Sequence, residues 1–205
     1  MSKRSKKRKP RRKKAKSRSA EAVEALASGI LINADRKGSL IRLIDTAIYL
    51  WFLERDPFAV HLLVCASYMV LCDLGQNNGK GPIIARDMGR FDMTLVYDFL
   101  RHAEPGMLHD SVDFAPEFNQ WMLFDGIWSF KRLYGGRTAF MRTFEAYYAL
   151  WPSPTHPKLR EKADTFLPEG LSIEEAEVLT RSQFFAKGTE MFANQIRRSG
   201  GGLAI

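Results

Sequence analysis

The chain has 205 residues, of which 45% are hydrophobic and 12% aromatic, and its formal net charge is +8. This length and composition fit one globular domain with a hydrophobic core and argue against two large domains. Its two cysteines, Cys65 and Cys72, are seven residues apart on a predicted helix, about 10 Å along the axis, which is too far for a disulfide. No Cys/His cluster indicates zinc, so we expect no metal or cofactor and a reducing, cytoplasmic location.

The net charge is distributed very unevenly along the chain. Residues 1–19 contain 12 Lys or Arg and no Asp or Glu, so they carry +12. The other 186 residues hold the remaining 19 of the 31 basic residues and all 23 acidic ones, so they carry −4. Any attraction to nucleic acid that the net charge implies therefore belongs to the first 19 residues.

Residues 1–19 are predicted to form a disordered basic tail, because they lack apolar side chains able to collapse and their like charges repel. We expect this tail to bind the phosphates of nucleic acids. The residues expected to make these contacts are Lys3, Arg4, Lys6, Lys7, Arg8, Lys9, Arg11, Arg12, Lys13 and Lys14. A signal resembling those for nuclear import and a solubilising leader are alternative roles for the same residues.

Two helices are predicted directly after the tail. Ser19 is a favoured N-cap for a short helix over residues 20–32. Ser39 is expected to cap a second helix running to about Leu53, in which apolar residues recur at spacings of three and four. These residues are Leu40, Leu43, Ile44, Ala47, Ile48, Trp51 and Phe52.

Asp56 and Pro57 open a third predicted helix, with Asp as N-cap and Pro in the first turn, which runs to about Leu74. Only two residues separate it from the second helix, so we expect an antiparallel helix hairpin. Its most apolar stretch, residues 58–72, is 15 residues long. That length is short for a membrane span and typical of a buried helix, so no membrane association is expected.

The run from Gly75 to Pro82 is predicted as a loop by its composition. Its glycines and Lys80 resemble a phosphate-binding loop, but one residue is missing between the glycines, and Gly81 replaces the Ser or Thr that would bind magnesium. Beyond it, Gly and Pro residues bound three further predicted helices. These helices cover residues 83–102, 116–134 and 138–150.

The C-terminal part begins with a Pro-rich break at residues 151–157, followed by a short helix to about residue 165. Ser172 and Glu175 form a capping box that opens a last predicted helix through about Ile196. Residues 199–205 are rich in Gly and are expected to fray. The sequence thus predicts an all-α domain over residues 20–198, with no convincing strand pattern.

Two histidines lie in informative surroundings. His61 is predicted to be a core residue, because it stands among apolar residues of the third helix. A functional role for it would need a partner from another helix. Asp98 and His102 are four residues apart on one predicted helix face, with Arg101 beside them. A carboxylate can orient a His ring and raise its pKa, which suits either a general acid/base or a structural ion pair.

Two stretches resemble bacterial HEPN-like helical proteins. They are IDTAIYLWF at residues 44–52, and DPFAVHLL at residues 56–63, which is similar to that family's Asp-Pro turn and Ile-His element. The segment DFLRHA at residues 98–103 is similar to their Asn-Phe-Phe-Lys-His-Ala element. The resemblance covers about residues 38–150 and implies a HEPN-like helical bundle, here with extra C-terminal helices. HEPN folds commonly pair, so it also implies a homodimer.

Catalytic HEPN proteins are metal-independent ribonucleases with an Arg and a polar residue before the catalytic His. His102 and Asp98 match the last two positions, but Tyr97 stands at the Arg position and supplies no permanent cation. We therefore expect an uncharacterised HEPN-like interaction module that binds RNA or other polyanions through the tail. The alternative is a metal-independent ribonuclease of toxin or defence type. In it, His102 would act as general acid/base, Asp98 would orient it, and Arg101 would stabilise phosphate charge.

Overall fold

The computed structural model describes residues 35–75, 79–83, 115–151 and 157–200. The chain divides into two compact units, Met1–Asp35 and Arg36–Ile205, and the elements described below all belong to the second. The predicted tail and the helix predicted over residues 20–32 lie outside the described residues, as does all of the helix predicted over 83–102 except Ile83.

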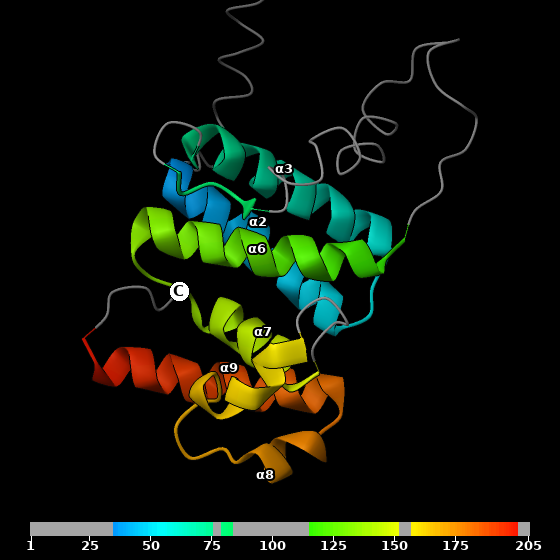
Figure 1. The fold of residues 1–205 in the computed structure, drawn as a ribbon, viewed down its shortest axis with the longest axis vertical. Coiled ribbons are helices and arrows are strands. Elements are labelled where there is room, and N and C mark those ends of the chain that lie inside the picture. The colour runs from blue at the N-terminus through cyan, green and yellow to red at the C-terminus, as the bar shows by residue number, and fades with distance from the viewer. Residues whose placement is uncertain (1–34, 76–78, 84–114, 152–156, 201–205) are drawn as a thin grey trace, which may run out of the picture. The chain divides into compact units, whose positions relative to one another are not determined.

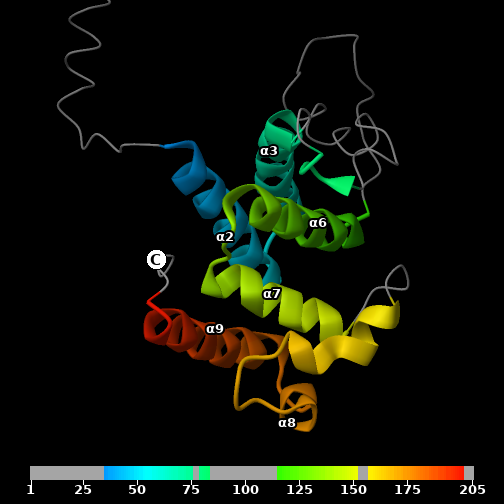
Figure 2. The same ribbon diagram turned by 60° about the vertical axis from the view of Figure 1, so that its left-hand side comes forward.

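Every regular element among the described residues is helical, and these ranges contain no strand, so the predicted all-α class is confirmed. The elements are α2 (Arg36–Phe52), α3 (Pro57–Gly75), α6 (Glu117–Tyr134), α7 (Ala139–Leu150), the 3₁₀ segment η1 (Pro157–Thr165), α8 (Ile173–Glu177) and α9 (Arg181–Arg198). Figure 1 and Figure 2 both show α3 lying beside α6 and α7 beside α9, and these pairs are in contact.

Helix α2 is central to the packing, because it contacts α3, α6, α7 and α9. Its buried residues follow the predicted helical spacing. They are Leu40, Ile41, Ile44, Ala47, Ile48 and Phe52. The predicted start at Ser39 was wrong, since the helix already begins at Arg36 and Ser39 lies inside its first turns. Asp35 directly precedes Arg36 and belongs to a residue type favoured at the N-cap, which accounts for the earlier start.

The predicted hairpin of α2 and α3 is confirmed, since the two helices pack together across a short turn. Within that turn Glu54 adopts a positive φ of 51°, and the Arg55 N–H donates to the Leu50 carbonyl at 3.0 Å. Asp56 acts as the predicted N-cap, because its Oδ1 accepts a hydrogen bond from the Phe58 N–H at 3.0 Å.

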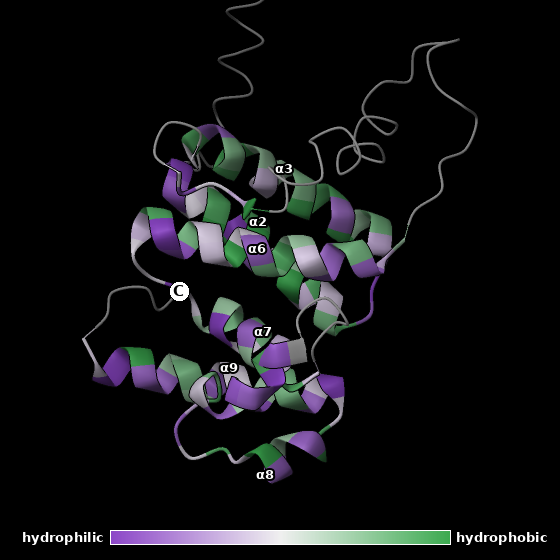
Figure 3. Ribbon diagram, viewed as in Figure 1, coloured by the Kyte–Doolittle hydropathy of each residue, from purple (hydrophilic) through white to green (hydrophobic). Residues whose placement is uncertain are grey.

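Helix α3 is largely apolar along its length (Figure 3) and is 19 residues long, which exceeds the 15-residue apolar stretch of the sequence. By length and composition it could cross a membrane, and 44% of the qualifying stretch is buried inside the protein. Core helices of soluble proteins have the same length and composition. The expected lack of membrane association therefore stays a prediction.

Helices α6 and α7 begin and end where local capping signals place them. Gly135 ends α6 in the left-handed conformation, with φ of 77°, and its N–H donates to the Lys131 carbonyl at 2.8 Å. Thr138 caps α7, since its Oγ1 accepts from the Met141 N–H at 3.1 Å. Both boundaries agree with the predictions from the sequence.

The single helix predicted from residue 173 to Ile196 was wrong, because two helices occupy this range. Ser172 and Glu175 form the predicted capping box, but the helix that they open, α8, has only five residues. Thr180 and Gln183 then form a second capping box, which opens α9. Extended backbone at Thr180 separates the two helices, and its Oγ1 accepts from the Gln183 N–H at 3.3 Å.

A polar contact ties α2 to the beginning of α7. The Thr138 hydroxyl, which already accepts from the α7 backbone, donates to Asp45 Oδ1 at 2.7 Å. Burial raises the pKa of Asp45 to about 7, although the Thr138 hydrogen bond acts in the opposite direction. Among the described residues, Asp45 has no ion pair and no second hydrogen bond.

Ionisation of Asp45 should therefore cost stability at neutral pH. Because the folded state holds this proton more tightly than the unfolded chain, the free energy of unfolding falls as the pH rises from about 4 to about 7. Asp45→Asn keeps an oxygen for Thr138 but cannot ionise. Its free energy of unfolding minus that of wild type should therefore be higher at pH 7.5 than at pH 5, by about 1–3 kcal/mol. Urea unfolding at both pH values measures this difference. The exposed Asp164→Asn is the control, and equal pH dependence of wild type and Asp45→Asn would refute the assignment.

Candidate functional site

The site residues predicted from the sequence lie outside the described part of the chain. Asp98, Arg101 and His102 fall within residues 84–114, and the ten tail residues between Lys3 and Lys14 fall within residues 1–34. Their proposed roles stay predictions. The structure does describe His61, the glycine-rich loop and one charged cavity that the sequence analysis did not single out.

His61 is a buried core residue, as predicted, and only 2% of it is exposed. It nevertheless has the partner from another helix that a functional role would need. Its Nδ1 lies 2.8 Å from Asn119 Oδ1 on α6, and its Nε2 lies 3.2 Å from Cys65 Sγ on α3. Burial lowers the pKa of His61, and the Asn119 hydrogen bond partly offsets this, so the ring is neutral at physiological pH.

The directions of these hydrogen bonds follow from Asn119. Its Nδ2 donates to the Pro57 carbonyl at 2.9 Å, so Oδ1 faces His61 and accepts from Nδ1–H. The neutral ring then leaves Nε2 as an acceptor for the Cys65 thiol. A thiol, an imidazole and an orienting amide are the groups of a cysteine nucleophile. However, Cys65 is 0% exposed and lies inside a helix, so the arrangement holds α3 against α6.

Asp125 makes a second polar link between α3 and α6. The Tyr68 hydroxyl of α3 donates to Asp125 Oδ2 at 2.6 Å, and the Ile83 N–H donates to Oδ1 at 3.1 Å. Asp125 is buried and accepts from both groups, so it fixes the described end of the loop after α3 to the middle of α6.

The glycines of the Gly75–Pro82 loop serve close backbone packing. A Cβ built on Gly75 would lie 2.1 Å from the Gly81 nitrogen, so no larger residue fits there without a shift of the backbone. Gly79 has a φ of 66°, and the Gly81 carbonyl accepts from Arg132 at 2.7 Å. Backbone packing and conformation thus explain why glycine occurs at these three positions, and no bound phosphate is needed for it. The described part of this run agrees with the loop prediction.

The charged cavity lies between α6, η1 and α7 and has a volume of about 220 Å³. It is lined by Trp128, Lys131, Arg137, Arg142, Glu145, Thr165 and Phe166. Three of these side chains are cations and one is a carboxylate, so the lining carries a formal charge of +2. An excess of cations over carboxylates suits an anionic ligand rather than a metal ion. No cluster of His, Cys, Asp or Glu able to hold a metal occurs in the described ranges.

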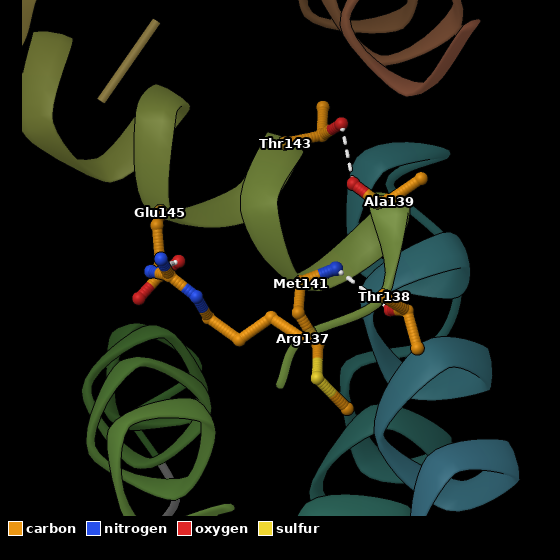
Figure 4. A network of polar contacts seen from close by, with 6 residues as sticks. All are labelled: Arg137, Thr138, Ala139, Met141, Thr143 and Glu145. Carbon is orange, nitrogen blue, oxygen red and sulfur yellow. Dashed lines mark hydrogen bonds and ion pairs between the residues drawn. The ribbon is translucent and has the colours of Figure 1, made fainter. Parts of the chain in front are cut away.

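Local structure explains how the charged groups meet. Gly135 ends α6 one turn after Lys131, and Arg137 directly precedes the N-cap of α7. The Arg137 side chain can therefore extend along the first two turns of α7 and reach Glu145, with which it forms an ion pair (Figure 4). Arg142 is three residues before Glu145 and so projects from a neighbouring part of the same helix face.

Burial dominates the electrostatics of this cavity. Only 1% of Glu145 is exposed; burial raises its pKa, and the nearby charges, foremost that of Arg137, oppose the rise. Burial also lowers the pKa of Arg142, and the positive charge of Arg137 adds to this effect. A guanidinium nonetheless stays charged at physiological pH. The cavity thus concentrates positive charge in partly desolvated surroundings, where it attracts an anion more strongly than exposed cations would.

Two buried polar atoms on residues that line this cavity have no hydrogen-bond partner within the described residues. They are the donor Trp128 Nε1 and the acceptor Glu145 Oε1. Buried polar groups are normally satisfied, so each such atom calls for an explanation. The sequence carried one signal for Glu145, since it follows Met141 and Phe144 and precedes Tyr148 on the buried side of α7. An acidic residue among such neighbours needs a partner, but its spacing does not reveal which one.

Comparison of the chain with protein families, with curated proteins and with solved structures gave no match. The resemblance to HEPN-like proteins over residues 38–150 thus stays a prediction, and the functional argument below depends on charge, burial and hydrogen bonding.

The burial of Cys65 predicts a large difference in reactivity between the two cysteine thiols. Cys72 is partly exposed, whereas modification of Cys65 requires local unfolding of α3. In native protein, iodoacetamide should modify Cys65 on the order of 100-fold more slowly than Cys72. Mass spectrometry of Cys72→Ser and Cys65→Ser gives each rate separately. Rapid modification of Cys65 would contradict its structural role and favour a nucleophile.

Proposed function

We propose that this protein is a helical interaction module that binds RNA or other polyanions through its basic N-terminal residues. The observation that carries the proposal is the division of charge, with +12 on residues 1–19 and −4 on the rest of the chain. A polyanion gains attraction only from the first part, because the second part as a whole repels it.

Such binding should respond strongly to salt. Each phosphate that a Lys or Arg neutralises releases condensed counterions, so the logarithm of the affinity for a single strand falls with the logarithm of the salt concentration, by about 0.7 per phosphate. Ten basic residues between Lys3 and Lys14 give room for several such contacts at once. The cationic cavity of the helical unit supports the same function as a separate, local site for one phosphate.

A HEPN-like bundle, a homodimer and a cytoplasmic location are further parts of this proposal. They are supported by the sequence resemblance over residues 38–150 and by the reduced cysteines. The all-α class of the described residues agrees with a bundle of this kind.

Deletion of residues 2–19 should abolish retention of RNA at low salt, because the remaining chain is acidic. The sharper variant replaces these residues by an uncharged segment of equal length, which separates charge from chain length. Binding isotherms at several salt concentrations should show a steep slope for wild type and, for both variants, a slope no larger than the roughly 0.7 of a single phosphate. Unchanged retention by the uncharged variant would refute the role of the tail.

A metal-independent ribonuclease is the second candidate, favoured by the spacing of Asp98, Arg101 and His102. If His102 is the general acid/base, the full-length protein should cleave mixed RNA in the presence of EDTA, and His102→Ala should lose about 100-fold or more of the rate. His156→Ala is the matched control, since it removes a histidine from a different segment. Cleavage that survives His102→Ala would rule out this assignment, and so would the absence of cleavage by wild type.

A further inference from the structure

We propose that the cavity between α6, η1 and α7 binds a ribose phosphate, with the phosphate held by Lys131, Arg142 and the Trp128 indole N–H, and a neighbouring ribose hydroxyl held by Glu145. The proposal concerns a site in the helical unit and not in the tail. Its extension to RNA rests on the polyanion binding proposed above, whereas its extension to free nucleotides does not.

The cations of this cavity are only partly compensated by protein groups. Arg137 pairs with Glu145, but Lys131 and Arg142 form no ion pair with any described residue. Aromatic rings hold both of them in place instead. The Lys131 Nζ lies 5.0 Å from the centroid of Trp128, and the Arg142 guanidinium carbon lies 4.6 Å from that of Phe192. A cation–π contact leaves N–H groups free to donate, so both side chains are positioned for an anion.

The two unpartnered atoms define what else the ligand must carry. Trp128 Nε1 is a donor and suits a phosphate oxygen. Glu145 Oε1 is an acceptor and repels a phosphate oxygen, so it needs a donor from the ligand. A hydroxyl on the same ligand meets this need. The cavity therefore requires an anionic group and a hydroxyl together, and an ionised phosphate ester without a neighbouring hydroxyl satisfies only the first requirement.

The size of the cavity restricts where that hydroxyl lies. About 220 Å³ is below the roughly 300–1,000 Å³ typical of pockets that enclose whole drug-sized ligands. A phosphate and part of one sugar fit this space, while a nucleobase would stay outside. The hydroxyl must then be close to the phosphate, as the 2′-hydroxyl is beside a 3′-phosphate in ribose. Structured water alone is the competing occupant, since each water takes about 30 Å³.

The Trp128 indole N–H gives a direct readout of the site. The chain has four Trp, so Trp128→Phe identifies the Trp128 signal in a ¹H–¹⁵N spectrum of the full-length protein. Adenosine 3′-monophosphate should shift this signal and bind about 10-fold or more tightly than its 2′-deoxy analogue. A short RNA should likewise shift it more than DNA of the same sequence, which tests the polymeric form of the ligand.

Variants of the cations test which groups make the site. Lys131→Gln and Arg142→Gln should each weaken binding of adenosine 3′-monophosphate by about 10- to 100-fold, because each removes a charge-assisted hydrogen bond. Lys158→Gln and Arg198→Gln are matched controls that remove an exposed cation outside the cavity and should leave the affinity unchanged. Circular dichroism and melting temperatures confirm folding. Lys131→Gln, whose side chain is half-buried, keeps the test valid if Arg142→Gln fails to fold.

Three results would overturn the proposal. An unmoved Trp128 signal at millimolar ligand would mean that the cavity holds only water. Equal affinity for the ribose and 2′-deoxy compounds would remove the role of Glu145. Equal weakening by the control variants would place binding elsewhere. None of these results depends on the tail, because replacement of residues 2–19 tests RNA retention separately. A tail without effect together with a responsive Trp128 would refute only the proposed polyanion function.

Discussion

The arrangement of the helices depends on an aromatic contact between the C-terminal turn of α2 and the helices α7 and α9. Phe52 stacks on Phe185 of α9, with ring centroids 4.6 Å apart, and Trp51 meets Phe144 of α7 edge-on at 5.0 Å. The Arg181 guanidinium carbon lies 3.4 Å from the Trp51 centroid, and its Nη2 donates to the Trp51 carbonyl. Each aromatic pair adds about 0.5–1.5 kcal/mol to the effect of burial, so this cluster joins helices that are distant in sequence.

The charged cavity follows from that contact. Because α2 fixes α7 through the aromatic cluster, and Asp45 fixes the α7 N-cap through Thr138, the face that carries Arg142 and Glu145 has a defined position. That face meets Trp128 and Lys131 of α6 across the cavity. A carboxylate that is 1% exposed is costly to bury, and Arg137 compensates only one of its oxygens. The excess of cations and the remaining polar atoms suit this part of the helical unit to an anionic ligand, although the chain beyond the tail has a net negative charge.

Attraction and recognition would be separate in such a protein. A basic tail attracts any polyanion over a distance set by the salt concentration, but it distinguishes poorly among them. A small cavity with fixed donors and one fixed acceptor has the opposite properties, since it is short in range and selective for a particular arrangement of phosphate and hydroxyl. The buried His61 network plays no part in either, because its three polar groups satisfy one another and the Pro57 carbonyl.

The sequence by itself determined the helical class and those helix ends that depend on local chemistry. Asp56, Gly135 and Thr138 each satisfy backbone groups within a few residues, so their roles can be predicted from the local sequence. The break before α9 was missed although Thr180 and Gln183 also act locally, because a first capping box at Ser172 suggested that the helix continued. Only the tertiary structure decided the partner of His61 and the composition of the cavity. Their groups come from helices far apart in the chain, and side-chain packing, which no spacing rule encodes, brings them together.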